Sequence, residues 1–200
     1  MRMTNQRYEE IKRTIGDFLD DYGVSTLPVD VFDLVEKMKI KVVLASKLLR
    51  KYPKKIDECI LFKYPNSFLY YDPDNQRFVI YIDDVGCRKK RQRFSLAHEL
   101  MHIILGHTEQ NEKNETEANF GATYLLMPTS LVLIAPKECV LLLPEVVSEI
   151  FDVSLPAAMV AVRYNSNRLS LLDLDEREYE KTINNLLGES LMSQVRRYHQ

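Results

Sequence analysis

Two histidines and a glutamate at close spacing are the residues of this chain best suited to chemistry. His98, Glu99 and His102 form an H-E-x-x-H pattern inside the apolar segment 94–105, which is expected to be a buried helix. On a helix, residues four apart lie on one face about 6 Å from each other, so both imidazoles can bind one metal ion. Glu99 can then act as general base toward a water at that metal. The pattern is typical of zinc peptidases.

The alternative is a helix in which the two histidines merely satisfy polar neighbours. The pattern uses two of the four histidines of the chain, and it places both in an apolar segment. Buried polar groups need partners, and a single metal ion would partner both imidazoles at once. The sequence therefore favours a Zn²⁺ site.

A catalytic zinc ion needs a third protein ligand and one open position. Glu115 and Asn119 are four residues apart and share a helix face, so a ligand carboxylate and a polar partner for a ligand imidazole would lie together. Glu117 would lie about 200° further round the helix and is the alternative ligand. The other acidic residues between the motif and Asn119 are Glu109 and Glu112. The spacing favours Glu115 as the metal ligand and Asn119 as its neighbour.

His107 is the third imidazole near the motif. It follows His102 by five residues, so it is expected to point to a different helix face. We interpret it as a cation at the helix end or a surface residue, with the role of metal ligand as the weaker alternative.

Helices and short strands must position these residues. Apolar residues at three- to four-residue spacing predict helices at 4–22, 29–38, 89–106, 115–126 and 156–164, and a final charged helix. Segments rich in β-branched and aromatic residues predict strands at 40–44, 59–63, 67–71 and 78–82, with a turn at 73–75 and a further strand at 169–174. Residues 46–57 are basic, contain Pro53 and are expected to form a loop.

These elements predict an α+β fold in which a small sheet of three or four strands precedes the motif helix. We expect two domains: a zincin-like metallopeptidase domain at 1–136, and a small helical subdomain at 137–200. Within the second, residues 144–165 have the rhythm of a helix-turn-helix with its turn at 152–154.

Composition excludes several classes of function. The chain has 200 residues, 46% of them hydrophobic, and a net charge of −2, so there is no electrostatic case for nucleic acid or an anionic membrane. No apolar run reaches the roughly 18 residues of a membrane helix, and the polar N-terminus lacks the apolar core of a signal peptide. The expected location is the cytoplasm.

The cysteines do not suggest a second metal site or a disulfide framework. Cys59, Cys87 and Cys139 are widely spaced, odd in number and form no C-x-x-C pair. We expect free thiols in a reducing compartment.

The helix-turn-helix rhythm supports a competing, non-enzymatic interpretation: a DNA-binding regulator with structural zinc. Charge argues against it, because residues 138–168 carry four acidic residues (Glu138, Glu145, Glu149, Asp152) against Arg163 and Arg168, whereas a groove reader should be basic. Direct nucleic-acid binding is therefore disfavoured, and this segment is expected to serve packing or interaction. A third interpretation is one half of a toxin–antitoxin pair that acts by sequestering its partner.

Two blocks of sequence resemble the ImmA/IrrE family of bacterial and phage metallopeptidases. Residues 91–102 resemble the family pattern R-x-R-F-[ST]-x-A-H-E-x-x-H, and residues 115–128 resemble E-x-E-A-N-x-F-A-x-x-L-L-M-P. The resemblance extends over about residues 5–165. Two positions depart from the family: Met101 replaces the usual glycine in the first block, and Gly121 replaces the usual phenylalanine in the second.

The resemblance implies a small zincin-like fold with a three-stranded sheet. It also implies cleavage of a cytoplasmic partner protein, commonly a helix-turn-helix repressor encoded nearby, whose loss relieves repression of a mobile element, phage or stress regulon. The family's first glutamate in the second block falls on Glu115 and its Asn/Asp on Asn119, which agrees with the argument from helix faces. A Tyr, His or Arg usually helps to stabilise the oxyanion; the sequence does not choose among these types, and Tyr70, Tyr71, Tyr81 and Tyr124 are all candidates.

Overall fold

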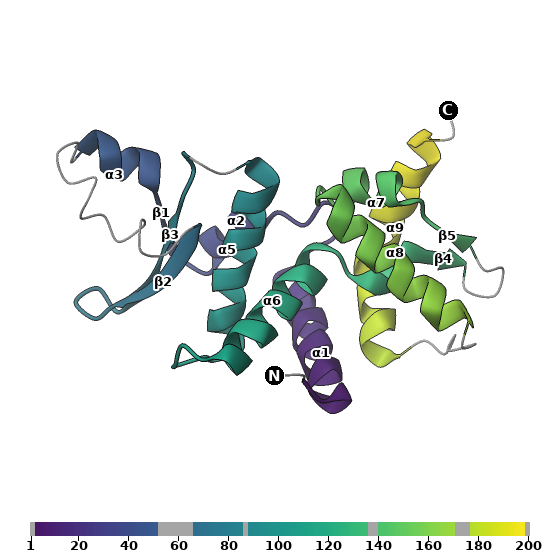
Figure 1. Cartoon of the computed structure of the whole chain (residues 1–200), viewed down its shortest axis with the longest axis horizontal. Coiled ribbons are helices and arrows are strands. Elements are labelled where there is room, and N and C mark those ends of the chain that lie inside the picture. Colours follow the sequence, from purple (N-terminus) through teal and green to yellow (C-terminus); the bar gives the residue numbers. More distant parts are fainter. Residues whose placement is uncertain (1–2, 52–65, 86–87, 136–139, 171–176, 199–200) are drawn as a thin grey trace. The chain divides into compact units, whose positions relative to one another are not determined.

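The computed structural model describes residues 3–51, 66–85, 88–135, 140–170 and 177–198 (Figure 1). By its contacts the chain divides into two units, and each is described separately. The site unit comprises Asp30–Ala122, and the second unit comprises Met1–Val29 with Thr123–Gln200. This division differs from the domain boundary expected after residue 136, because the first helix of the chain packs with the last.

A three-stranded sheet forms one side of the site unit. Its strands β1 (Lys41–Leu44), β2 (Ser67–Asp72) and β3 (Arg77–Ile82) lie in the order β1-β3-β2. β1 pairs with β3 in parallel, and β2 pairs with β3 antiparallel, with Ser67 opposite Ile82 and Tyr71 opposite Phe78. These strands confirm the predictions at 40–44, 67–71 and 78–82. The strand predicted at 59–63 lies outside the described residues, as do all three cysteines.

The helices of the site unit lie beside this sheet. α5 (Lys89–Ile104) contacts both β2 and β3 as well as α2 (Val31–Lys37). The α2 N-terminus is capped by the Asp30 carboxylate, which accepts hydrogen bonds from two backbone amides of the first turn. α6 (Glu112–Leu126) follows α5 after a short connection. The predicted helix at 115–126 therefore begins one turn earlier than expected, at a polar segment whose acidic residues favour the helix dipole.

One prediction in this unit is wrong. Residues 46–51 were expected to be a loop, but Ala45–Lys51 forms helix α3. The Asp84 carboxylate accepts hydrogen bonds from the Ser46 amide at 2.8 Å and the Ser46 hydroxyl at 2.6 Å. This contact satisfies an amide of the first turn, while Arg50 and Lys51 in the last turn favour the C-terminal dipole.

Helix α5 is anchored by a buried face. Leu96, Ala97, Leu100 and Met101 have no exposed surface. The helix ends at Ile104, and Gly106 follows with φ +67°, a left-handed conformation that favours glycine at helix ends. The predicted helix is thereby confirmed.

The two departures from the family pattern are in contact with each other. A Cβ atom on Gly121 of α6 would lie 2.6 Å from Met101 Cε and 3.1 Å from Met101 Cγ of α5. The Met101 side chain thus occupies space that a larger residue at 121 would need. The long side chain of Met101 fits because Gly121 has no side chain. The two departures from the family pattern therefore account for each other.

This contact predicts strong coupling between positions 101 and 121. Gly121→Phe should cost about 1–3 kcal/mol of unfolding free energy by overpacking, and Met101→Gly about 2–5 kcal/mol by leaving a cavity. The double variant should recover about 0.5–3 kcal/mol relative to the sum of the single changes. Urea unfolding of the four proteins measures this coupling, and strict additivity would contradict it.

The second unit is mainly helical. It contains α1 (Asn5–Asp21), a 3₁₀ turn (Thr129–Val132), the short strands β4 (Leu133–Ala135) and β5 (Val140–Leu141), and the helices α7 (Pro144–Ile150), α8 (Leu155–Ser170) and α9 (Glu178–Tyr198). α1 packs along α9, and the buried Lys12 amino group lies 3.4 Å from the Tyr179 hydroxyl. Of the helices that the structure describes, none combines the length and apolar character needed to cross a membrane.

The helix-turn-helix prediction is confirmed as a local fold. α7 and α8 pack together across a connection in which Asp152 has φ +47°. The strand predicted at 169–174 is not formed at its first two residues, which complete α8. Residues 171–174 of that prediction lie outside the described residues.

Candidate metal centre

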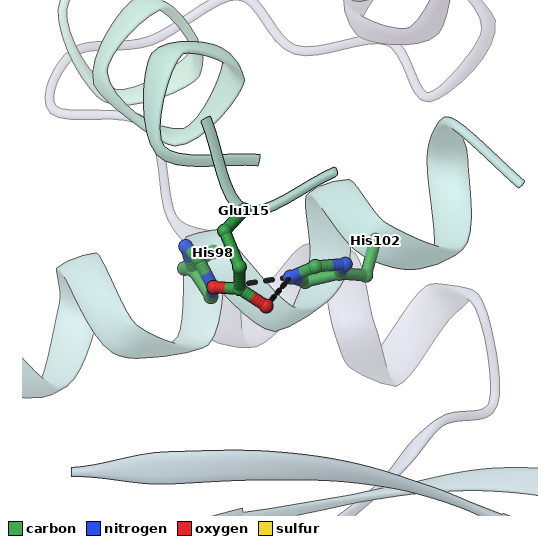
Figure 2. Close-up of side chains that lie close together, drawn as sticks. All are labelled: His98, His102 and Glu115. Carbon is green, nitrogen blue, oxygen red and sulfur yellow. Dashed lines mark hydrogen bonds and ion pairs between the residues drawn. The ribbon is translucent and has the colours of Figure 1, made fainter. Parts of the chain in front are cut away.

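Three side chains of the site unit converge on one point (Figure 2). His98 and His102 lie one turn apart on α5, and Glu115 reaches them from α6. The two Nε2 atoms are 3.1 Å apart. Glu115 Oε2 is 3.3 Å from His98 Nε2, and Glu115 Oε1 is 3.5 Å from His102 Nε2. The helix spacing read from the sequence therefore places both imidazoles and one carboxylate together.

These separations suit a small tetrahedral cation. Zinc binds imidazole nitrogen and carboxylate oxygen at about 2.0–2.1 Å, so the ligand atoms of a tetrahedral site lie about 3.3–3.4 Å from one another. The two Nε2 atoms are 3.1 Å apart, and they lie 3.3 and 3.5 Å from different oxygens of the Glu115 carboxylate, so all three separations are close to that value. Two nitrogens and one oxygen are also a donor set that zinc favours in catalytic sites. Three ligands leave one position of the tetrahedron open.

The pKa values of both imidazoles are lowered, which favours their neutral form. Burial lowers the pKa of His98, although Glu115 and the side chain of Asn119 act in the opposite direction. Burial, followed by the neighbouring His98 and His107, lowers the pKa of His102 to about 4. A neutral imidazole has a lone pair to offer, so little free energy is spent on deprotonation when a cation binds. The predicted proximity of Asn119 to a candidate ligand is present at His98.

Glu99 lies beside the three converging residues and is almost completely buried, with 6% of its surface exposed. Burial raises its pKa to about 7. A hydrogen bond of 2.7 Å from the Ser67 hydroxyl to Glu99 Oε1 opposes that rise, and the charge of Glu115 adds to it. A carboxyl group with a pKa near neutrality can both accept and release a proton at physiological pH.

The two alternative ligands of the sequence interpretation lie elsewhere. Glu117 is buried, and its Oε2 is 3.3 Å from His107 Nε2. His107 Nδ1 is 3.0 Å from His102 Nδ1, which is the ring nitrogen that faces away from Glu115. Neither residue belongs to the cluster of His98, His102 and Glu115. His107 was expected at the surface, but its side chain is only 6% exposed.

A pocket of about 1010 Å³ opens over the cluster. Residues of β2, β3, α5, α6 and the connection before α6 line it. Its apolar part includes Leu69, Tyr71, Phe78 and Phe94, and Tyr71 contacts Phe78 edge-on at 5.3 Å. Of the four tyrosines considered for oxyanion stabilisation, Tyr71 lines this pocket.

A buried glutamate beside two histidines and a second carboxylate is the set of side chains that a metallopeptidase requires. The chain matches the family model Peptidase_M78, the IrrE N-terminal-like domain, over residues 36–158. This match spans more than half of the chain, so the chain belongs to this peptidase family. The match confirms the resemblance to ImmA/IrrE proteins. None of the curated proteins matches the sequence.

Proposed function

We propose that the protein is a zinc-dependent endopeptidase that cleaves a specific cytoplasmic partner protein. The observation that carries this proposal is the spacing of His98, His102 and Glu115, which suits zinc, next to a buried Glu99 with a pKa near 7. His98, His102 and Glu115 would hold the ion through Nε2, Nε2 and a carboxylate oxygen. When bound, zinc supplies a Lewis acid that polarises a carbonyl and makes water more acidic.

The residues of the chain account for the movement of protons. Ionised Glu99 takes a proton from the attacking water and later delivers it to the leaving amine. Ser67 holds the Glu99 carboxylate by donating a hydrogen bond to Oε1. Asn119 lies close enough to His98 to raise the pKa of that imidazole, and so favours its position next to the ion. Burial leaves only 6% of the Glu99 surface in contact with bulk water.

The sheet edge beside the pocket supports a polypeptide substrate. β2 is the last strand in the order β1-β3-β2, so its outer edge pairs with no other strand among the described residues. Ser67, Phe68, Leu69 and Tyr71 of β2 all line the pocket. An extended peptide can add to such an edge by main-chain hydrogen bonds while its side chains enter the pocket. This geometry favours cleavage within a chain.

The proposed partner is a helix-turn-helix repressor encoded nearby, as the family resemblance implies. The test is to mix the purified product of the adjacent gene with the wild-type protein, the chelated protein and the chelated protein after zinc is restored. We expect one or a few discrete cuts that disappear on chelation and return with zinc. Partner binding without cleavage under all three conditions would support sequestration instead. Casein is a poor substitute for this partner in the assay, because a selective peptidase need not cleave it.

The exposed face of α8 gives no support to the DNA-binding alternative. Leu155, Met159 and Val160 are exposed there beside Arg163, and the apolar side chains do not neutralise phosphates. Affinity for duplex DNA that falls steeply with salt would contradict this interpretation.

Removing the Ser67 hydroxyl should change the pH dependence of cleavage. The hydrogen bond lowers the pKa of Glu99, so Ser67→Ala should raise that pKa further. Glu99 must be ionised to accept a proton, so the acidic limb of the kcat/KM profile should move to higher pH while the rate at high pH stays close to wild type. Thr108→Ala, which removes another hydroxyl that lines the pocket, is the matched control. An unmoved profile for Ser67→Ala would contradict the role of this contact.

A further inference from the structure

Three side chains, those of His102, His107 and Glu117, form a row that begins at the His102 ring nitrogen facing away from the proposed metal. His102 Nδ1 lies 3.0 Å from His107 Nδ1, and His107 Nε2 lies 3.3 Å from Glu117 Oε2. The side chains of His107 and Glu117 are 6% and 2% exposed. At such burial polar atoms must find partners within the protein, so these contacts constrain where protons can sit. The proposed reaction does not use either residue directly.

With Glu117 ionised and His107 neutral, one arrangement of protons satisfies the whole row. An ionised Glu117 can only accept, so His107 Nε2 must carry a proton and donate it. The other nitrogen of a neutral His107, Nδ1, is then an acceptor, so His102 Nδ1 must be the donor of the contact between the two rings. His102 Nε2 is left with its lone pair. That nitrogen is the one that lies 3.1 Å from His98 Nε2 and 3.5 Å from Glu115 Oε1.

We propose that Glu117, acting through His107, holds His102 in its Nδ1-protonated tautomer and fixes the orientation of its ring for metal binding. His107 and Glu117 are thus positioning residues. His107 cannot share an ion with His102 Nε2, because it lies against the opposite nitrogen of that ring. The metal step of this inference rests on the proposed zinc site, whereas the arrangement of protons does not.

The neighbouring charge does not replace this row. Lys113 Nζ lies 3.8 Å from Glu117 Oε1, and its side chain is 61% exposed, so the pair is worth little in water. The two imidazole rings meet edge-on, with their planes at 73°. An edge-on approach suits a donor nitrogen that faces an acceptor nitrogen better than it suits stacking of two rings.

The first test needs no metal. Long-range ¹H–¹⁵N correlation spectra of the metal-free wild-type protein should show the proton on Nδ1 of His102 and on Nε2 of His107. A proton on Nε2 of His102 would overturn the proposal. Because this experiment uses the unaltered protein without zinc, it stands even if the proposed peptidase activity fails.

The second test compares two substitutions with opposite properties. His107→Leu keeps bulk but removes the acceptor, whereas His107→Asn loses bulk but places an amide oxygen near the former Nδ1. By chelator competition, His107→Leu should bind zinc about 10–100-fold more weakly than wild type, and His107→Asn should lie closer to wild type. The reverse order would show that His107 only fills space and would overturn the proposal. Failure of the wild type itself to bind zinc would instead refute the proposed zinc site.

A double-mutant cycle with Glu117 and His107 tests whether Glu117 acts on His102 through His107. Glu117→Leu should weaken zinc binding, and the double variant with His107→Leu should be no weaker than His107→Leu alone, because Glu117 acts through His107. Additive losses would overturn the proposed order. Glu109→Leu removes an exposed pocket carboxylate outside the row and should leave zinc affinity unchanged. Circular dichroism of each variant separates loss of the fold from loss of the metal.

Discussion

A Glu99→Gln variant is expected to keep its fold and its zinc while losing peptide hydrolysis by about 10²–10⁴-fold, the range attributed to general acid–base catalysis. The amide has the shape of the carboxylate and can still accept the hydrogen bond from Ser67. It cannot take a proton from water at neutral pH. Glu99 is not one of the three residues that could bind the metal, which are His98, His102 and Glu115. The zinc affinity of the variant should therefore remain within a few-fold of wild type.

The same substitution should stabilise the metal-free protein at alkaline pH. Burial raises the pKa of Glu99 from 4.5 to about 7, so between these values the folded state binds more protons than the unfolded state. Stability of the wild type therefore falls as pH rises from about 4.5 to about 7, by an amount on the order of 3 kcal/mol. Glutamine does not titrate and avoids this loss. Urea unfolding at pH 5 and pH 8 should show the advantage of the variant only at the higher pH.

Two outcomes would contradict the assignment of Glu99 as the base. One is cleavage at a rate near that of the wild type, and the other is loss of zinc together with loss of activity. Glu109→Gln is the matched control, because Glu109 lines the same pocket but is exposed. Its rate and its stability should both stay close to those of the wild type.

The central part of the site could be predicted because it depends on short-range helix geometry. A spacing of four residues within α5 fixes the relation of His98 to His102 whatever surrounds the helix. The choice of Glu115 over Glu117 follows from the same geometry on α6, and the structure brings Glu115 to the imidazoles. The strands could be predicted because turn residues at 73–75 separate two segments rich in aromatic and β-branched residues.

Other features depend on contacts between residues far apart in sequence. Ser67 reaches Glu99 from the first position of β2, 32 residues away, and a serine in a strand carries no local sign of such a role. His107 and Glu117 are ten residues apart on either side of a polar loop, and only the fold shows that both are buried. The start of α3 depends on a carboxylate 38 residues further along the chain. Periodicity in sequence holds no information about these partners.

Replacing Glu115 is the change expected to affect the metal most while affecting the fold least. Its side chain is 47% exposed, and in the metal-free protein it contributes only partly solvated contacts with two neutral imidazoles. We expect Glu115→Gln to change the unfolding free energy of the metal-free protein by at most about 1 kcal/mol. Zinc affinity should fall by more than about 100-fold, beyond the range for residues that only support a ligand.

Thermal unfolding with and without zinc measures both effects. At a zinc concentration about 100 times the wild-type dissociation constant, binding should add about 2.7 kcal/mol to the stability of the wild type, and less than about 0.4 kcal/mol to that of Glu115→Gln. Glu112→Gln, one turn earlier on α6 and exposed, should behave as wild type.

Glu117→Gln decides between the two candidate ligands. It keeps an oxygen that can accept from His107, so it should retain most of the gain from zinc. If Glu117→Gln lost that gain and Glu115→Gln kept it, Glu117 would be the ligand and Glu115 an exposed neighbour. The exposed carboxylate thus has the larger effect on the metal and the buried one the smaller, which is the opposite of what burial alone would predict.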